Sequence, residues 1–324
     1  MSSILVLIES QNNQIKKASL EALTYARAFA NNNNYSVNAL VDGRLPSEVL
    51  SQIGQYGADK VITLTDERLN NFDAKAYAYM VAEVAKSSGS ETVVLSYNIC
   101  GKAIAGRVAK LLNAGLVAGA IDIPVMTDGF VVKKGVFSGK AFAHVRINTT
   151  NKVIALTPNA YKTEQCVKAG VLETSTLAIP SEQFSTKVKD TQRTTGKIPL
   201  TEAELVVSGG RGLKGPENWG MLEETAGLLG AATACSRAVA DVHWRPHEEH
   251  VGQTGITIRP NLYVAVGISG AIQHLAGVNQ SKTIVVINTD KDAPFFSAAD
   301  YGVIGDAFEV VPKLNAALKK FKGQ

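Results

Sequence analysis

Polar residues follow an apolar stretch in the last third of the sequence, and their types and spacing suit the binding of a nucleotide. The apolar run of residues 263–268 stops at Ser269 and Gly270. Glycine allows a sharp turn there, and the free amides of a starting helix can face an anion. Gln273 and His274 then fall in the first turns of that short helix. These residues predict an anion site with two hydrogen-bonding side chains beside it.

A second apolar run, residues 283–287, ends in Asn288. In an open parallel sheet, ligands bind beyond the carboxyl ends of the strands, so the ends of both runs are expected to face one crevice. This pattern is typical of a nucleotide-cofactor site. Upstream, residues 251–255 read Val-Gly-Gln-Thr-Gly, so two glycines bracket the side chains of Gln253 and Thr254 in a segment too short for a regular element.

A glycine-rich turn lies at residues 208–215, which read Ser-Gly-Gly-Arg-Gly-Leu-Lys-Gly and contain a Gly-x-Gly-x-x-Gly pattern from Gly210 to Gly215. That pattern is the dinucleotide fingerprint of a dehydrogenase. The fingerprint also expects an acidic residue roughly 20 positions further on, but residues 234–237 read Ala-Cys-Ser-Arg. The interpretation as a nicotinamide site is therefore weakened, whereas Arg211 adds a cation suited to phosphate.

Together these segments resemble the electron transfer flavoprotein alpha subunit. The family signature has Leu or Ile before Tyr, a Ser-Gly or Asp-Gly pair, a Gln-His pair and a later Asn at fixed separations. This chain has Leu262-Tyr263, Ser269-Gly270, Gln273-His274 and Asn288. One departure is Val286, where alanine is usual, and this change concerns the packing of a strand more than the cofactor. The similarity is densest across residues 200–320.

The resemblance implies that FAD is held chiefly by the second half of the chain. Arg211 would contact its phosphates, and Arg237 would lie near the isoalloxazine and favour its anionic forms. The Thr254 hydroxyl would lie at flavin N5, with Gln253 beside it. His274 would lie at the flavin C2 carbonyl and stabilise an anionic, one-electron reduced form. The chemistry itself belongs to the cofactor.

The remaining expected contacts divide between the pyrophosphate and the adenosine of FAD. Ser269 would hold the pyrophosphate, and Asn288 and Asp306 would serve the adenosine half, although a helix or turn cap is the alternative role for Asp306. The residues expected to bind the cofactor are Arg211, Ser236, Arg237, Gln253, Thr254, Gly255, Ser269, Gly270, Gln273, His274, Asn288 and Asp306. No residue is expected to be catalytic.

Three histidines and two glutamates between residues 243 and 250 raise the possibility of a metal site. Pro246 interrupts any regular helix in this segment, so the spacing does not place the side chains on a common face. A solvated charged loop without a metal is the expectation. The three cysteines, Cys100, Cys166 and Cys235, lack metal-ligand spacing and suit reduced thiols in a cytoplasm.

The elements that must position these residues follow an α/β pattern. In the first half, short apolar runs alternate with helical patterns, which favours a mostly parallel sheet flanked by helices. Beyond about Gly119, alternating stretches indicate antiparallel strands at the edge of that sheet. A second such unit follows a polar segment, and its closing helix is expected at 312–320 with Pro312 in the first turn.

The length of 324 residues favours two domains. We expect an N-terminal α/β domain at 1–195, which docks a partner subunit, and a Rossmann-like FAD-binding domain at 196–324, with a hinge at 195–200. A hydrophobic content of 45% with 19% charged residues is ordinary for a globular protein, and a net charge of +4 is too mild to imply nucleic acid. No apolar run of about 18 residues predicts a membrane span. Without a signal or transit peptide, a cytoplasmic location is expected.

The resemblance further implies a heterodimer with an electron transfer flavoprotein beta subunit, in which an AMP is buried. This heterodimer would take electrons from acyl-CoA dehydrogenases and other flavin dehydrogenases. It would deliver them to the membrane-bound electron transfer flavoprotein-quinone oxidoreductase, without converting a substrate of its own. Two alternatives stay open, namely an NAD-dependent enzyme that uses the glycine-rich turn and a non-redox nucleotide-binding module whose first domain binds the ligand.

Overall fold

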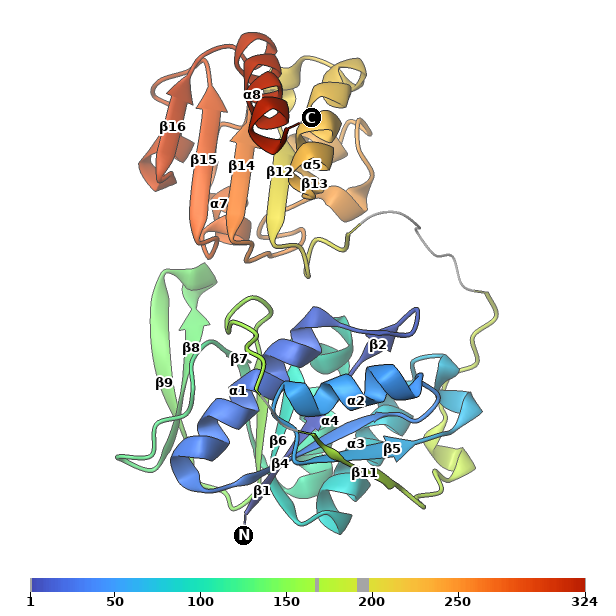
Figure 1. Ribbon diagram of the computed structural model, residues 1–324. Helices are drawn as coiled ribbons and strands as arrows, with labels where there is room; N and C mark the ends of the chain where they lie inside the picture. Colours follow the sequence, from blue (N-terminus) through green and yellow to red (C-terminus); the bar gives the residue numbers. More distant parts are fainter. Residues whose placement is uncertain (1, 167–168, 191–197, 324) are drawn as a thin grey trace. The chain divides into compact units, whose positions relative to one another are not determined.

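The computed structural model describes residues 2–166, 169–190 and 198–323, and the chain divides into two compact units (Figure 1). Unit 1 comprises residues 1–136 and 142–192, and unit 2 comprises residues 137–141 and 193–324. The expected domain boundary at residue 195 and the first part of the expected hinge lie outside the described residues. The expected class, α/β with two domains built on mostly parallel sheets, is confirmed.

Unit 1 is built on a nine-stranded sheet with the order β11-β5-β4-β1-β6-β10-β7-β8-β9. Its strands run in parallel from β11 to β7, and β8 pairs antiparallel to β7. The strands are β1 (Ser3–Leu7), β4 (Ser36–Asp42), β5 (Lys60–Leu64), β6 (Ser90–Ser96), β7 (Gly115–Ala120), β8 (Phe130–Val136), β9 (Ala141–Ile147), β10 (Lys152–Leu156) and β11 (Val171–Thr174), and a two-stranded ribbon joins β2 (Ser10–Gln11) to β3 (Gln14–Ile15).

The expected antiparallel edge of this sheet is confirmed, but the chain then returns to the interior of the sheet. β10 pairs in parallel with both β6 and β7, so the strand that follows the edge hairpin in sequence lies near the middle of the sheet. Its burial explains the placement, because Val153 to Leu156 are all buried. A strand buried on both faces reads as a continuous apolar run and belongs inside a parallel sheet.

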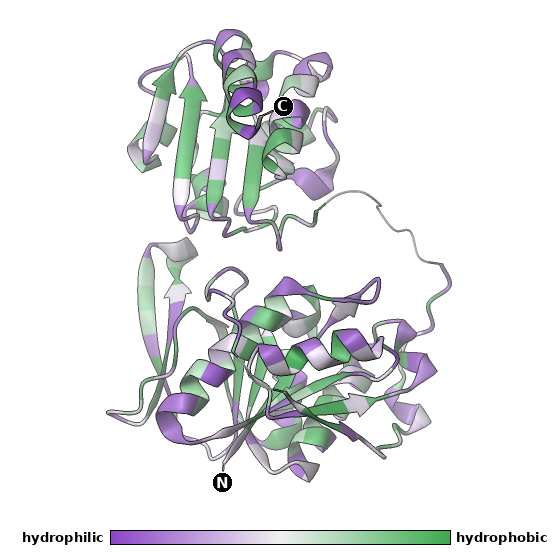
Figure 2. Ribbon diagram, viewed as in Figure 1, coloured by the Kyte–Doolittle hydropathy of each residue, from purple (hydrophilic) through white to green (hydrophobic). Residues whose placement is uncertain are grey.

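Two hydrophobic clusters cover the two faces of the first sheet. Alternate residues of β1 divide between them, since Ile4 and Val6 belong to one cluster and Leu5 and Leu7 to the other. The strands appear mostly hydrophobic in Figure 2, whereas the helices carry hydrophilic stretches. The helices are α1 (Lys17–Asn33), α2 (Ser47–Gln55), α3 (Ala74–Ser87) and α4 (Ile99–Leu112). Successive side chains of a strand point to opposite faces of a sheet, so a strand of this sheet contributes to both clusters.

Unit 2 has a five-stranded, fully parallel sheet with the order β13-β12-β14-β15-β16. One face is covered by α5 and α8, whose Leu222 and Val311 pack with Val264 of the sheet. The other face packs against α7 and the loop before β14, with Tyr263 at its centre. The elements are β12 (Leu205–Gly209), α5 (Gly220–Leu229), β13 (Ala232–Cys235), α6 (Arg237–Ala240), β14 (Leu262–Val266), α7 (Ile272–Val278), β15 (Thr283–Asn288), β16 (Tyr301–Ile304) and α8 (Ala307–Lys322).

The predicted start of the closing helix is wrong. Helix α8 begins at Ala307 rather than at Pro312, and the proline lies inside the helix. The Asp306 carboxylate accepts a hydrogen bond from the Phe308 amide at 3.0 Å, which satisfies a free amide of the first turn and fixes the helix start there. Proline is favoured in the first turn of helices but does not by itself mark it.

Candidate functional site

The strand order of unit 2 places a crevice at one edge of its sheet. From β12 the chain continues to β13 on one side, and β14 pairs with β12 on the other side. In such doubly wound sheets, ligands bind outside the carboxyl ends of the strands at the point where the order reverses. The structure has a cavity of about 650 Å³ at this point, lined by residues that follow β12, β13 and β14 and by the end of β15.

Glycines bring the loops after β12 and β14 into backbone contact. The Gly210 amide donates to the Val266 carbonyl at 2.9 Å, and the Gly212 amide donates to the Gly267 carbonyl at 3.0 Å. A Cβ atom on Gly210 would lie 2.1 Å from the Gly267 oxygen, and one on Gly212 would lie 2.7 Å from the Gly267 Cα. Gly267 itself has a φ of 62°. Only glycine therefore allows this crossing, which forms the floor of the crevice.

A second glycine contact places the 251–255 loop on helix α7. Gly252 lies against Gly277, where an added Cβ would be 2.5 Å from the Gly252 Cα. The Gln253 amide donates to the Gln273 carbonyl at 2.7 Å. The side chains of Gln253, Thr254 and Gln273 are exposed on the cavity wall. The loop therefore presents two hydrogen-bonding side chains next to the start of the helix.

His274 lies on the cavity wall at the start of α7 and is 7% exposed. Its Nε2 is 2.8 Å from the Tyr263 hydroxyl, which is itself fully buried. Its Nδ1 is also buried and has no hydrogen-bond partner among the described residues. Burial, with a smaller contribution from His250, lowers the pKa of His274 to about 4. The imidazole is therefore neutral at pH 7, with one ring nitrogen left for a ligand.

The segment around residues 243–250 differs from the expected solvated loop. His243 and His247 are exposed, but Glu249 and His250 are 5% and 2% exposed. The Glu249 carboxylate is held by the Arg245 guanidinium at 2.7 and 2.8 Å, and a paired carboxylate can be buried. His250 lines the cavity, and its Nδ1 has no partner within the described residues. Sequence reasoning missed His250 because burial here depends on residues far along the chain.

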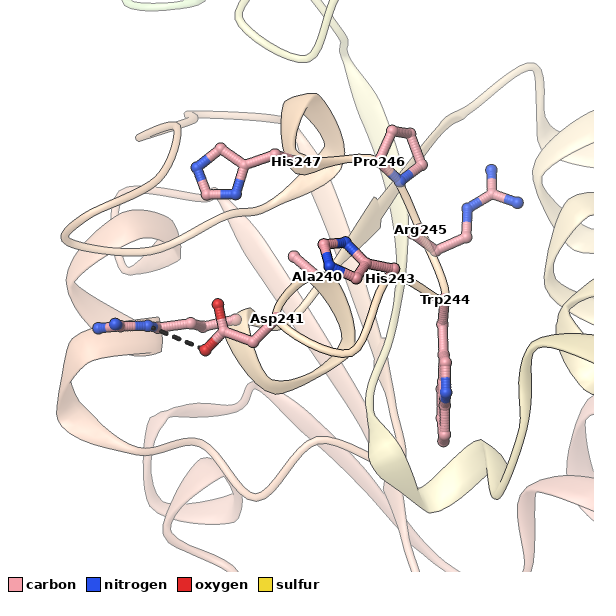
Figure 3. Close-up of a pocket in the computed structure, with 8 residues that line it drawn as sticks. Ala240, Asp241, His243, Trp244, Arg245, Pro246 and His247 are labelled. Atoms are coloured by element: carbon pink, nitrogen blue, oxygen red, sulfur yellow. Dashed lines mark hydrogen bonds and ion pairs between the residues drawn. The ribbon is translucent and has the colours of Figure 1, made fainter.

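The cavity borders a second one of about 630 Å³, and the Arg237–Asp241 ion pair of 3.3 Å lines both. Figure 3 shows this outer cavity and marks the ion pair at Asp241 with a dashed line. Its lining comprises Arg237, Ala240, Asp241, His243, Trp244, Arg245, Pro246 and His247. Across the described residues, no group of three or more His, Cys, Asp or Glu side chains is arranged to hold a metal ion.

The structure brings nine of the twelve expected residues to one cavity, namely Arg211, Ser236, Arg237, Gln253, Thr254, Ser269, Gln273, His274 and Asn288. The other three, Gly255, Gly270 and Asp306, do not line the cavity. The two glycines allow close packing of the chain, and Asp306 caps a helix. A Cβ on Gly255 would lie 2.3 Å from the His250 oxygen, and one on Gly270 would lie 2.5 Å from the Phe295 Cβ. Asp306 caps α8 and lies 3.8 Å from the Lys214 ammonium.

Further residues line the cavity without an individual sequence signal for binding. They are Gly212, Ala238, Asp241, His250, Val251, Gly252, Gly267, Ile268, Ala271 and Asp290. Most of them are neighbours of expected residues in the same loops, and adjacency in the sequence is the signal that could have found them. His250 lies next to the Val-Gly-Gln-Thr-Gly segment in this sense.

The residues at the site are suited to binding rather than to covalent chemistry. Cys235 ends β13, directly before the cavity residue Ser236, and is fully buried. Burial, together with the Glu249 charge, raises the pKa of this thiol to about 12, so it stays protonated and is a poor nucleophile. Arg211 and Arg237 are exposed cations on the cavity wall, and the neutral His274 offers one ring nitrogen. This set is suited to an anionic ligand that also offers a hydrogen-bonding atom to the imidazole.

Comparison with known proteins extends over both units. Residues 4–182 match the electron transfer flavoprotein domain, and residues 199–279 match the electron transfer flavoprotein FAD-binding domain. The chain is 37% identical to the electron transfer flavoprotein subunit alpha of Syntrophomonas wolfei, with 99% of this chain and 100% of that protein covered. It is 34% identical to the same subunit of Bacillus subtilis, with 98% and 97% covered.

A eukaryotic relative has the same extent of similarity. The mitochondrial electron transfer flavoprotein subunit alpha of Dictyostelium discoideum is 35% identical, with 99% of this chain and 93% of that protein covered. Among solved structures, MurG of Acinetobacter baumannii aligns with 99% of this chain and 90% of its own at 10% identity, but the TM-score of 0.31 is too low to carry an argument.

Proposed function

The chain belongs to the family of electron transfer flavoprotein alpha subunits, and from this premise we propose that unit 2 binds FAD in the cavity beyond β12 and β14. Two observations at the same cavity carry the proposal. Glycines allow the backbones of its loops to lie in close contact, and the buried Nδ1 of His274 has no partner among the described residues. A ligand that places a hydrogen-bonding atom at this nitrogen removes the cost of leaving it unpaired.

The residues present fit FAD in both of its halves. The crossing of Gly210, Gly212 and Gly267 leaves no Cβ between a ligand and the backbone. Arg211 and Ser269 would hold the pyrophosphate at this crossing, and Asn288 would face the adenosine. Asn288 also donates to the Ile268 carbonyl at 3.0 Å, which holds the end of β15 against the β14 loop. The expected adenosine contact of Asp306 stays a prediction, because its carboxylate caps α8.

The other wall of the cavity would hold the isoalloxazine, and bound FAD would supply reversible one- and two-electron chemistry there. Arg237 places a positive charge at this end, partly offset by Asp241 at 3.3 Å. Thr254 and Gln253 offer hydrogen bonds from the loop that is fixed on α7. His274 acts as a neutral hydrogen-bonding group, because burial opposes its protonation. Because the chemistry would belong to the bound cofactor, the chain would act as an electron carrier rather than an enzyme.

The partners follow from the family. We propose a heterodimer with an electron transfer flavoprotein beta subunit that contains AMP, with unit 1 as the docking domain. Acyl-CoA dehydrogenases and related flavin dehydrogenases would donate electrons, and the membrane-bound electron transfer flavoprotein-quinone oxidoreductase would accept them. Full-length relatives with the same subunit name support the heterodimer. Within the described residues, no helix is long and apolar enough to cross a bilayer. The cytoplasmic location stays a prediction.

A reductive titration of this chain, co-purified with its natural partner subunit, tests the proposal. The expected result is a bound flavin spectrum that changes in two separate one-electron steps. An intact complex that stays colourless after FAD is added would contradict the proposal, and affinity for a nicotinamide dinucleotide in that complex would favour the NAD-dependent alternative.

A further inference from the structure

Two cavities of unit 2 share part of their lining, and each of them is lined by a histidine of the 243–250 segment. The inner cavity is the proposed FAD site, and the outer cavity is the one shown in Figure 3. The Arg237–Asp241 ion pair lines both cavities. His247 is exposed and lines the outer cavity, whereas His250 is 2% exposed and lines the inner one.

The two imidazoles are close enough to exchange a proton through small side-chain movements or one water. Their ring centroids are 5.4 Å apart, and their planes are inclined by 61°. The Nδ1 of His250 is buried without a partner among the described residues. A Cβ on Gly252, which lines the inner cavity, would lie 3.4 Å from the His250 Nε2 and 3.7 Å from the His274 Cα. His250 therefore lies between the exposed His247 and the inner cavity.

The groups around His250 keep its imidazole neutral at rest. Burial lowers its pKa most, His247 and Arg237 lower it further, and Asp241 opposes them. His274 faces it from the inner cavity, Glu249 is occupied by Arg245, and Cys235 beside it stays protonated. A negative charge that arrives in the inner cavity favours the protonated form of a nearby imidazole. His250 is therefore set to accept a proton when that charge arrives.

We propose that His247 and His250 form a proton relay that leads from solvent to the inner cavity and supplies the proton taken up when the bound cofactor is reduced. This relay rests on the proposed function, and it assigns to His250 a role beyond the binding of the cofactor. An imidazole can accept a proton at one ring nitrogen and release one from the other, which suits a residue that lies between His247 and the inner cavity.

The relay moves one proton in each cycle and returns both histidines to the neutral form, and a ring that passes the proton from one nitrogen to the other then exchanges its tautomer before the next cycle. His247 takes a proton from solvent and becomes an imidazolium. It passes the proton to the neutral His250, which releases a proton into the inner cavity and returns to the neutral form. The proton neutralises the negative charge of the second electron, which comes from the reduced flavin of a donor dehydrogenase. The only bonds that form or break are N–H bonds, apart from the solvent O–H bond that releases the proton.

The heterodimer with bound FAD, photoreduced in weakly buffered solution with a pH-indicator dye, tests the relay. Flavin absorbance reports electron arrival, and dye absorbance reports proton uptake. His250→Gln is expected to slow proton uptake roughly a hundredfold, as for loss of a positioned acid-base group, with the number of protons unchanged. Free imidazole is expected to restore part of the rate. His247→Gln is expected to slow uptake roughly tenfold, because solvent can replace an exposed donor more easily.

His243→Gln is the matched control, since it removes an exposed histidine from the same outer cavity and should leave the uptake rate unchanged. The flavin content of each variant shows that the site is intact, and His247→Gln carries the test alone if His250→Gln loses flavin. Unchanged uptake in flavin-loaded variants would overturn the relay alone, as would equal slowing in the control. A wild-type complex without flavin would instead overturn the proposed function, and the relay with it.

Discussion

At the scale of single residues, the histidines of unit 2 fall into an exposed pair and a buried pair. His243 and His247 are exposed, whereas His250 and His274 are almost fully buried. A buried imidazole without a charged partner is neutral, because burial penalises the charged form. Both buried rings also have an Nδ1 without a partner among the described residues. Their chemistry in the cavity is therefore that of neutral hydrogen-bonding groups at pH 7.

The lowered pKa of His274 predicts a pH-dependent stability. Between pH 6.5 and about 4 the unfolded chain protonates this histidine and the native chain does not, so the free energy of unfolding falls as the pH is lowered through this window. The loss attributable to His274 is about 3 kcal/mol. In urea unfolding, the wild type should therefore lose about this much more free energy of unfolding than His274→Gln between pH 7 and pH 4. Parallel curves would contradict the prediction, and His243→Gln is the control.

Arg211 predicts an effect on cofactor affinity. Its guanidinium is exposed on the cavity wall and makes no ion pair within the part of the chain that the structure describes. Loss of a charged hydrogen bond to phosphate in Arg211→Ala is expected to raise the Kd for FAD roughly tenfold to hundredfold. Fluorescence titration of the apo heterodimer with FAD measures the change. Lys320→Ala, at an exposed position of α8, should bind like the wild type, and an unchanged Kd in Arg211→Ala would remove this residue from the site.

At the scale of elements, glycines decide how closely the loops around the site approach each other. The crossing of the β12 and β14 loops depends on Gly210, Gly212 and Gly267, and the contact of the 251–255 loop with α7 depends on Gly252 and Gly277. The hydrogen bonds between these backbones hold the loops in place before a ligand arrives. A preformed backbone site reduces the ordering cost of binding.

Gly210→Ala tests this arrangement. The new Cβ would lie 2.1 Å from the Gly267 oxygen, so one of the two loops must move. The expected result is a loss of more than about 1 kcal/mol in the free energy of unfolding of unit 2, together with reduced flavin content. Gly227→Ala in α5 is the matched control, because its Cβ meets nothing within 4 Å. This control should keep or gain stability, and equal effects of both substitutions would refute the role of the crossing.

At the scale of the whole molecule, each unit has hydrophobic clusters on both faces of its own sheet. The described residues that line the proposed FAD site all belong to unit 2. Both tryptophans of the chain, Trp219 and Trp244, also lie in unit 2. Tryptophan fluorescence therefore reports the unfolding of the unit that carries the site, whereas far-ultraviolet circular dichroism reports both units.

A ligand stabilises the unit that binds it in the native state. FAD at about 100 times its Kd is expected to add about 2.7 kcal/mol to the free energy of unfolding of unit 2. The tryptophan transition in urea should therefore move to higher denaturant, and hydrogen exchange should slow in β12 and β14 more than in β1 and β6. Equal protection of both sheets would show that the stabilising effect is not confined to the unit that carries the site.

Much of the fold and of the site could be predicted from the sequence, because local patterns carry that information. Apolar runs and helical spacing predicted the α/β class, and the motifs at Ser269-Gly270 and Gln273-His274 predicted residues that share one cavity. The same motifs indicated the family that the comparisons show. These features depend on neighbours within a few residues, and the periodicity of strands and helices records them directly.

Only the tertiary structure decided features that depend on distant residues. It placed β10 inside the first sheet, buried His250 beside the inner cavity, and showed Asp306 as the cap of α8. Burial of a side chain and the neighbours of a strand are set by packing between segments far apart in the sequence. The sequence by itself therefore determined the kind of fold, the family and nine of the residues that line the cavity. The tertiary structure decided which histidines are buried and how the loops cross, because both result from packing across the sheet.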